Sequence, residues 1–87
     1  MTEDTLFEFP CDFPIKVMGR DSPEFRAMAV ALIESHTGPL EAERVQTAVS
    51  RNGRFVSITM TVNAQSRDQL DDIYRDVSGH PSILMAL

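Results

Sequence analysis

The chain has 87 residues, which is enough for one compact domain and too short for two. Its formal net charge of −5 excludes the broad basic surface that non-specific binding to nucleic acid or to an anionic membrane requires. A single cysteine excludes an internal disulfide framework and a zinc site built from several cysteines. The N-terminus is acidic and no stretch has the ~20 apolar residues that span a bilayer, so a cytoplasmic location is expected.

The first twelve residues are expected to form an N-terminal arm, and residues 13–87 a single domain. Phe7 and Phe9 lie among acidic residues in this arm. These two aromatic side chains are the groups through which the arm would dock onto the body of the domain.

The first strand is predicted over residues 13–19, where apolar side chains alternate with others. Ser22 and Pro23 are typical of a helix start, because serine caps free N–H groups and proline suits the first helical position. Apolar residues then recur at helical spacing as far as Ile33. Residues 36–39, His-Thr-Gly-Pro, would end this helix.

A hairpin, a second helix and a final strand are predicted in the rest of the chain. Residues 41–50 form a weaker strand, and an Asn-Gly pair favours a tight hairpin turn after it. Regular alternation over residues 55–64 predicts a strand with one face on the core. Ser66 begins a helix with a capping-box pattern, and residues 82–87 would close the chain as an apolar strand.

This order of elements predicts an α+β fold. Two right-handed crossovers would place both helices on one face of a four-stranded antiparallel sheet. The expected architecture is the ferredoxin-like βαββαβ sandwich. That fold is shared by many proteins and carries no function by itself.

Three segments resemble a known family. Residues 9–19, Phe-Pro-Cys-Asp-Phe-Pro-Ile-Lys-Val-Met-Gly, look like the opening motif of the YbeD-like family of small bacterial proteins. Residues 53–75 resemble that family's hairpin strand and second helix, and residues 80–87 are similar to its closing segment. The resemblance implies a ferredoxin-like fold that is similar to the regulatory ACT domains of amino-acid-metabolising enzymes. It implies no established catalytic activity and no catalytic residues.

Polar residues at the starts of the two helices form a candidate ligand site. Residues 19–23 resemble the turn that ACT domains use in small-ligand pockets, although Glu24 stands where a second glycine is often found. The first and third strands are expected to run parallel, which would bring the loops after them together. Two helix N-termini and two arginines would then receive a small anion; the simpler alternative is that both serines are ordinary caps. The candidate residues are Gly19, Arg20, Asp21, Ser22, Asn63, Ser66 and Arg67.

The sheet face that the helices leave open is a second candidate site. It is expected to be almost uncharged apart from Lys16 and Arg44. RNA-recognition domains of this fold stack bases on two or three aromatic rings, whereas Phe55 is the only ring here, so RNA binding is disfavoured. Contact with a protein partner fits a small polar face with apolar borders better. The candidate residues are Lys16, Met18, Phe55, Ser57, Thr59, Thr61 and Leu84, with the alternate row of the last strand as the alternative to Leu84.

The last strand, residues 82–87, is apolar on both faces. A strand with one face in solvent does not need this pattern. Self-association or docking of a partner would explain it, and so would an N-terminal arm that covers the strand with Phe7 or Phe9. Both interpretations stay open on the sequence.

The remaining reactive side chains form no catalytic constellation. His36 and His80 each follow a helix, and the same topology would place them at one end of the sheet, but two ligands are too few for a metal. Cys11 has no Cys-x-x-Cys partner and is expected to pack as a small hydrophobe. The sequence thus predicts a non-catalytic protein without cofactor or metal that regulates or binds another protein. The alternative is an ACT-like sensor of a small metabolite at the helix N-termini.

Overall fold

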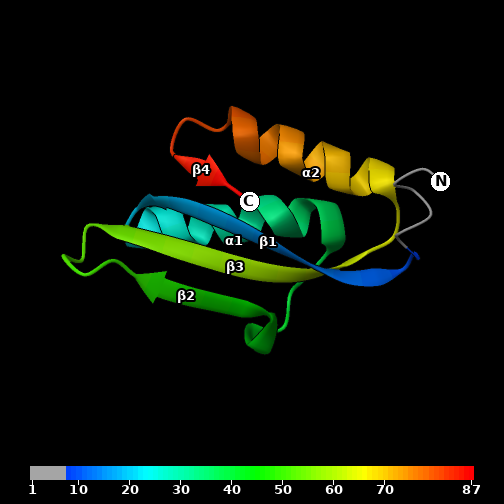
Figure 1. Cartoon of the computed structure of the whole chain (residues 1–87), viewed down its shortest axis with the longest axis horizontal. Coiled ribbons are helices and arrows are strands. Elements are labelled where there is room, and N and C mark those ends of the chain that lie inside the picture. Colours follow the sequence, from blue (N-terminus) through cyan, green and yellow to red (C-terminus); the bar gives the residue numbers. More distant parts are fainter. Residues whose placement is uncertain (1–7) are drawn as a thin grey trace.

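The computed structural model describes residues 8–87, so the predicted docking of Phe7 lies outside the described residues. The sheet has the order β2-β3-β1-β4 with antiparallel neighbours, and the predicted α+β ferredoxin-like arrangement is confirmed (Figure 1). Within residues 8–87, no helix has the length and apolar character needed to cross a membrane. The elements are β1 (Cys11–Arg20), α1 (Pro23–Thr37), the 3₁₀ helix η2 (Ala42–Arg44), β2 (Val45–Val49), β3 (Phe55–Ala64), α2 (Arg67–Gly79) and β4 (Met85–Ala86).

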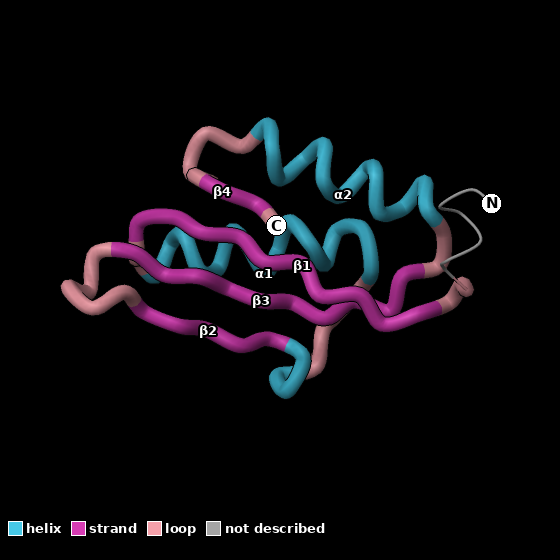
Figure 2. The backbone as a smooth tube through the Cα atoms, in the orientation of Figure 1, coloured by secondary structure: helices cyan, strands magenta, loops and turns pink. Residues whose placement is uncertain are grey.

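The two long strands β1 and β3 form the centre of the sheet (Figure 2). They pair along their whole length, from Cys11 opposite Ala64 to Arg20 opposite Phe55. Strict alternation fixes this register, because a slip by one residue would turn the buried row of β3 into solvent.

Both helices pack on the same face of this sheet and supply the other half of one hydrophobic core. The helices bury an apolar stripe, while the strands bury alternate residues. The largest fully buried side chains are Ile15, Val17, Ile33, Val56, Ile58, Met60, Val62, Ile73 and Val77.

The first strand is longer than predicted. β1 begins at Cys11, so two residues assigned to the arm belong to the sheet. Cys11 is half-buried and packs against the core, as expected of a small hydrophobe. Phe9, just before the strand, also packs against the core.

The two outer strands are shorter than predicted. β2 begins only at Val45, because the preceding residues form the turn of η2. The last strand is reduced to Met85–Ala86, because the Ile83 N–H donates to the His80 oxygen (3.1 Å) and keeps the chain in a turn until that point. Both outer strands therefore leave the sheet with short edges.

The expectation that the first and third strands run parallel is wrong. The crossover through α1 makes β1 parallel to β2, and the hairpin then reverses the chain into β3. β3 is consequently antiparallel to β1. This direction decides which loops share an end of the molecule.

Candidate functional site

The predicted ligand site is divided between the two ends of the sheet. Arg20 lies opposite Phe55, whereas Asn63 lies opposite Asp12. Along β1 these two positions are separated by roughly 26 Å at ~3.3 Å per residue. Gly19, Arg20, Asp21 and Ser22 therefore stand at one end, and Asn63, Ser66 and Arg67 at the other.

At the first end, Ser22 and Asp21 are occupied by helix α1 itself. The Ser22 Oγ accepts a hydrogen bond from the Phe25 N–H (2.9 Å), so the serine is the N-cap. Both oxygens of Asp21 accept from the Arg26 guanidinium, at 2.8 and 2.9 Å. This hydrogen-bonded pair lowers the pKa of Asp21 and raises that of Arg26.

Gly19 and Arg20 also have partners within the fold. A Cβ at position 19 would overlap the ring of Phe25 and would stand 2.7 Å from the Ser82 carbonyl oxygen. The glycine is thus required by close packing. The Arg20 guanidinium lies over the Phe55 ring, 5.8 Å from its centre, which is a cation–π distance. Phe55 is the ring on which the RNA alternative would stack a base, so Arg20 competes with that stacking.

At the second end, Ser66 is the N-cap of α2. Its Oγ accepts from the Gln69 N–H (3.1 Å). The Gln69 Oε1 accepts a hydrogen bond from the N–H of Gln65 (2.8 Å), the residue before the cap. In a capping box this side chain would instead accept from the N–H of the cap residue itself. Arg67 is the exposed first residue of the helix. Both predicted serines therefore follow the simpler alternative and cap their helices.

Asp12, Arg44 and Asn63 form a polar cluster where β2 begins. The Asp12 Oδ1 accepts from Arg44 (3.1 Å) and from the Asn63 amide (3.3 Å), and these bonds lower the pKa of Asp12, with Arg44 contributing most. Arg44 also donates to the Thr61 carbonyl oxygen (3.3 Å). Arg44 was predicted to charge the open face, but its charge is balanced there by Asp12.

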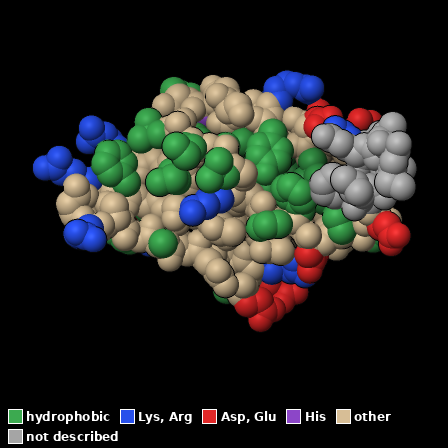
Figure 3. Space-filling view, in the orientation of Figure 1, with side chains coloured by type: hydrophobic (Ala, Val, Ile, Leu, Met, Phe, Trp, Pro, Cys, Tyr) green, Lys and Arg blue, Asp and Glu red, His purple; other side chains and the backbone are tan. Residues whose placement is uncertain are grey.

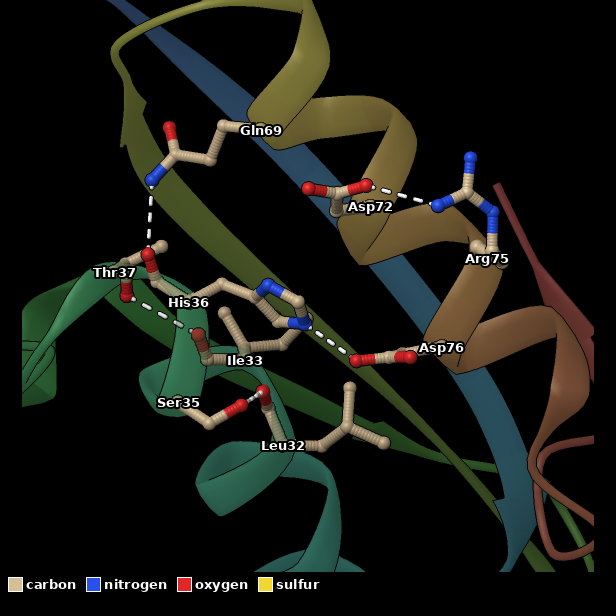
Figure 4. Close-up of polar contacts among 9 residues, drawn as sticks. All are labelled: Leu32, Ile33, Ser35, His36, Thr37, Gln69, Asp72, Arg75 and Asp76. Atoms are coloured by element: carbon tan, nitrogen blue, oxygen red, sulfur yellow. Dashed lines mark hydrogen bonds and ion pairs between the residues drawn. The ribbon is translucent and has the colours of Figure 1, made fainter.

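The C-termini of α1 and α2 lie toward opposite ends of the sheet, which corrects the expectation that the two histidines share one end. Figure 4 shows His36 beside α2, near Gln69 and Asp76 of that helix. His36 ends α1 beside α2: its Nε2 is 2.6 Å from Asp76, and its carbonyl oxygen accepts from Gln69 (3.0 Å). His80 follows the far end of α2 and accepts the Ser82 N–H (3.1 Å). Among residues 8–87, no three metal-ligating side chains stand together.

A cleft of about 520 Å³ opens at the end of β1, between α1 and the loop before β4. Its lining is largely apolar, and Arg20 and Ser22 are the predicted ligand residues that reach it. The sequence reasoning missed the contribution of residues 81–84, which an antiparallel β1–β4 pair brings to this end. The lining residues are Arg20, Ser22, Glu24, Phe25, Met28, Pro81, Ser82 and Leu84.

The open face of the sheet assembles the predicted residues into two adjoining rows. Lys16 lies opposite Thr59, and Met18 lies opposite Ser57. No helix in the described part of the chain packs on this side, since the buried residues of β1 and β3 all lie on the other. The rows are Pro14, Lys16, Met18 and Arg20 on β1, and Phe55, Ser57, Thr59 and Thr61 on β3.

Leu84 does not belong to this face. It lines the cleft, and the register of β4 places Met85 opposite Met18 in its stead. Leu87 exchanges backbone hydrogen bonds with Lys16 (2.8 and 3.1 Å) and thus extends the same row as Met85. Met85 and Leu87 are 51% and 63% exposed. The sequence left open whether Leu84 or the alternate row of the last strand faces this side, and the register shows that it is the alternate row.

The arm does not cover β4 with Phe9. Phe9 precedes Cys11, which pairs with Ala64, whereas β4 pairs with Val17 and Met18 near the other end of β1. Within residues 8–87, an aromatic side chain of the arm therefore does not cover the exposed apolar residues of β4.

On the face that Figure 3 shows, charge is separated along the long axis. Basic side chains gather at the hairpin end, where Arg20 is joined by Arg51 and Arg54 of the turn. Acidic side chains gather around η2 and toward the opposite end, and hydrophobic side chains lie over β1 and β4.

Comparison with known sequences shows which family the chain belongs to. The family described as "Protein of unknown function (DUF493)" matches residues 4–87. The chain belongs to this DUF493 family. Relatives called "UPF0250 protein" include one from Paraburkholderia phytofirmans, 48% identical over 97% of this chain and 94% of the relative. One from Nitrosomonas europaea is 38% identical over the full length of both. These relatives are the small uncharacterised bacterial proteins that the YbeD-like motifs indicated, and their names assign the DUF493 chain no activity.

Proposed function

We propose that the protein is a non-catalytic module that binds another protein through its open sheet face. The observation that carries this proposal is the composition of the face: Lys16 and Arg20 flank Met18 along β1, whereas the residues opposite them on β3 and β4 carry hydroxyl or apolar side chains. Burying such side chains against a partner costs far less than burying charges.

The β4 edge supports the same proposal. Met85 and Leu87 are more than half exposed, and they lie opposite Met18 and Lys16 of β1 respectively. Apolar surface gains about 25 cal/mol for each Å² removed from water, so a partner that covers this edge gains affinity there.

The hydroxyl groups of the face support binding over catalysis. The Ser57 Oγ donates to the Ala48 carbonyl oxygen (3.5 Å), which is not a base that could activate it. The proposed role needs no cofactor, and a cytoplasmic location belongs to the same proposal.

A matched pair of variants tests the face. Tagged wild-type protein, Ser57→Arg and Ser78→Arg would be used to capture partners from a nuclease-treated lysate of a bacterium that carries a DUF493 protein. Ser57 lies beside Met18 on the face, whereas Ser78 is exposed on α2. A partner that is retained by the wild type and by Ser78→Arg, and reduced about tenfold or more by Ser57→Arg, supports the proposal. Equal retention of the partner by both variants contradicts the proposal. So does a partner that is retained from an untreated lysate but not from the nuclease-treated one.

A further inference from the structure

The outer edge of β2 is an unprotected strand edge. β2 ends the sheet, no helix of residues 8–87 lies over it, and its residues 46–49 are exposed (Figure 1). Its sequence, Val-Gln-Thr-Ala-Val, contains neither a charge nor a proline. Charged residues and prolines are among the features that keep edge strands from pairing. Because β2 has neither, its outer edge is available for another strand.

The backbone groups that this edge offers follow from the ladder to β3. The Ser50 N–H donates to the Phe55 oxygen (2.8 Å), and bonded positions alternate along an antiparallel pair. Thr47 and Val49 therefore direct their N–H and C=O groups away from β3. Val45 directs its carbonyl outward, while its N–H is bonded within η2.

We infer that the β2 edge pairs with the β2 edge of a second copy of this chain, antiparallel about a twofold axis at Thr47. Each Thr47 then exchanges N–H···O bonds with the Thr47 of the other copy. Each Val49 N–H meets a Val45 carbonyl across the axis. The contact uses the same surface of both copies, so it closes as a dimer and joins the two sheets into one.

The charges at the two ends of β2 select this pairing. Glu43 lies four residues before Thr47, and Arg51 lies four residues after it. Antiparallel pairing about Thr47 brings the start of β2, with Glu43 in η2, next to the end of the other copy's β2, with Arg51 in the hairpin turn, whereas parallel pairing would bring like charges together. Neither side chain has an ion-pair partner in residues 8–87, so both are available to the second copy.

Apolar side chains reinforce the same register. Val45 and Val49 lie on the helix side of the sheet, opposite Met60 and Val56 of β3. Val45 is partly buried against the edge of the core, whereas Val49 is 51% exposed. In the inferred dimer the two valines face each other across the axis, where they gain from exclusion of water.

The oligomeric state in solution tests the inference. Sedimentation of the full chain is measured up to about 1 mM, and a concentration-dependent dimer is expected. Thr47→Pro removes an N–H that β3 does not use, so it should give a monomer with an unchanged circular dichroism spectrum. Thr47→Val keeps the N–H and should stay dimeric. If Thr47→Pro fails to fold, Thr47→Lys, which sets two ammonium groups together on the axis, should also give a monomer. A monomeric wild type, or a dimer that survives these changes, overturns the inference.

Charge reversal tests the register. Glu43→Arg and Arg51→Glu should each raise the dimer dissociation constant by about tenfold, and the double variant should return it to near the wild-type value. Additive weakening without rescue would overturn the register. The β2 edge is distinct from the open face, so Thr47→Pro should leave capture of a partner through Ser57 unchanged, and the two proposals can fail separately.

Discussion

At the scale of single residues, Gly19 is fixed by packing. The Phe25 ring and the Ser82 carbonyl occupy the space that a side chain would need, and this contact joins β1, α1 and the loop before β4. A local pattern marks such a glycine as a turn or a ligand residue. Only the tertiary structure shows that its role is to let three segments meet.

Gly19→Ala is expected to lower the free energy of unfolding by about 1–3 kcal/mol, because the new methyl group overpacks the core. Gly79→Ala is the matched control: nothing lies within 4 Å of a Cβ there, and alanine favours a helix by up to about 1 kcal/mol. Urea unfolding followed by circular dichroism measures both. Equal stability of the two variants would show that position 19 is open.

Asp21 gives the protein a pH-dependent contribution to stability. Its pKa is lowered by the hydrogen bonds from Arg26 from an ordinary value of 3.8, so the folded state binds this proton less readily than the unfolded chain. The contribution is therefore complete above that ordinary value and is lost as the pH falls through the lower folded value.

Asp21→Asn should accordingly be less stable than the wild type at pH 7, and the difference should shrink between pH 5 and pH 2. Urea midpoints across this range measure it. Asp68→Asn, at an exposed carboxylate in the first turn of α2, controls for the general effect of removing an acid. A difference for Asp21→Asn that stays constant with pH would contradict the assigned role of Arg26.

At the scale of elements, the sequence is most informative where a pattern is local. The alternation of β3 and the two serine caps were predicted correctly, because each depends on neighbours a few residues away. The direction of β3 relative to β1 was predicted wrongly, because it depends on how the α1 crossover and the β2–β3 hairpin combine. That error joined Ser22 to Ser66 in one predicted site, although the fold holds them at opposite ends.

The N-cap at Ser22 contributes to the stability of α1, so removing it should lower the free energy of unfolding. Ser22→Ala removes the acceptor for the Phe25 N–H and should cost about 1 kcal/mol of unfolding free energy. Ser78→Ala, at an exposed position inside α2, should change stability by less than about 0.5 kcal/mol. Thermal or urea unfolding separates them, and a silent Ser22→Ala would exclude the cap.

At the scale of the whole molecule, the uncovered surfaces are the edges and the open face. The helices cover β1 and β3 on one side and leave β2 exposed, while Met85 and Leu87 stay in solvent at the other edge. Composition predicted an acidic protein without a broad basic surface. The positions of the basic hairpin end, of Met85 and of the cleft could not be predicted from composition. They depend on the sheet register, which brings together residues far apart in the chain.

The methionines report directly on the central claim that the open face binds a partner. Met18 and Met85 adjoin each other on that face, Met28 lines the cleft, and Met60 is fully buried. Labelling the methionine methyl groups with carbon-13 gives each site its own NMR signal, which would be followed while the captured partner is added. The account predicts that the Met18 and Met85 signals shift or broaden while those of Met28 and Met60 stay unchanged. A response of Met28 with Met18 and Met85 unaffected would contradict it and would place the contact in the cleft.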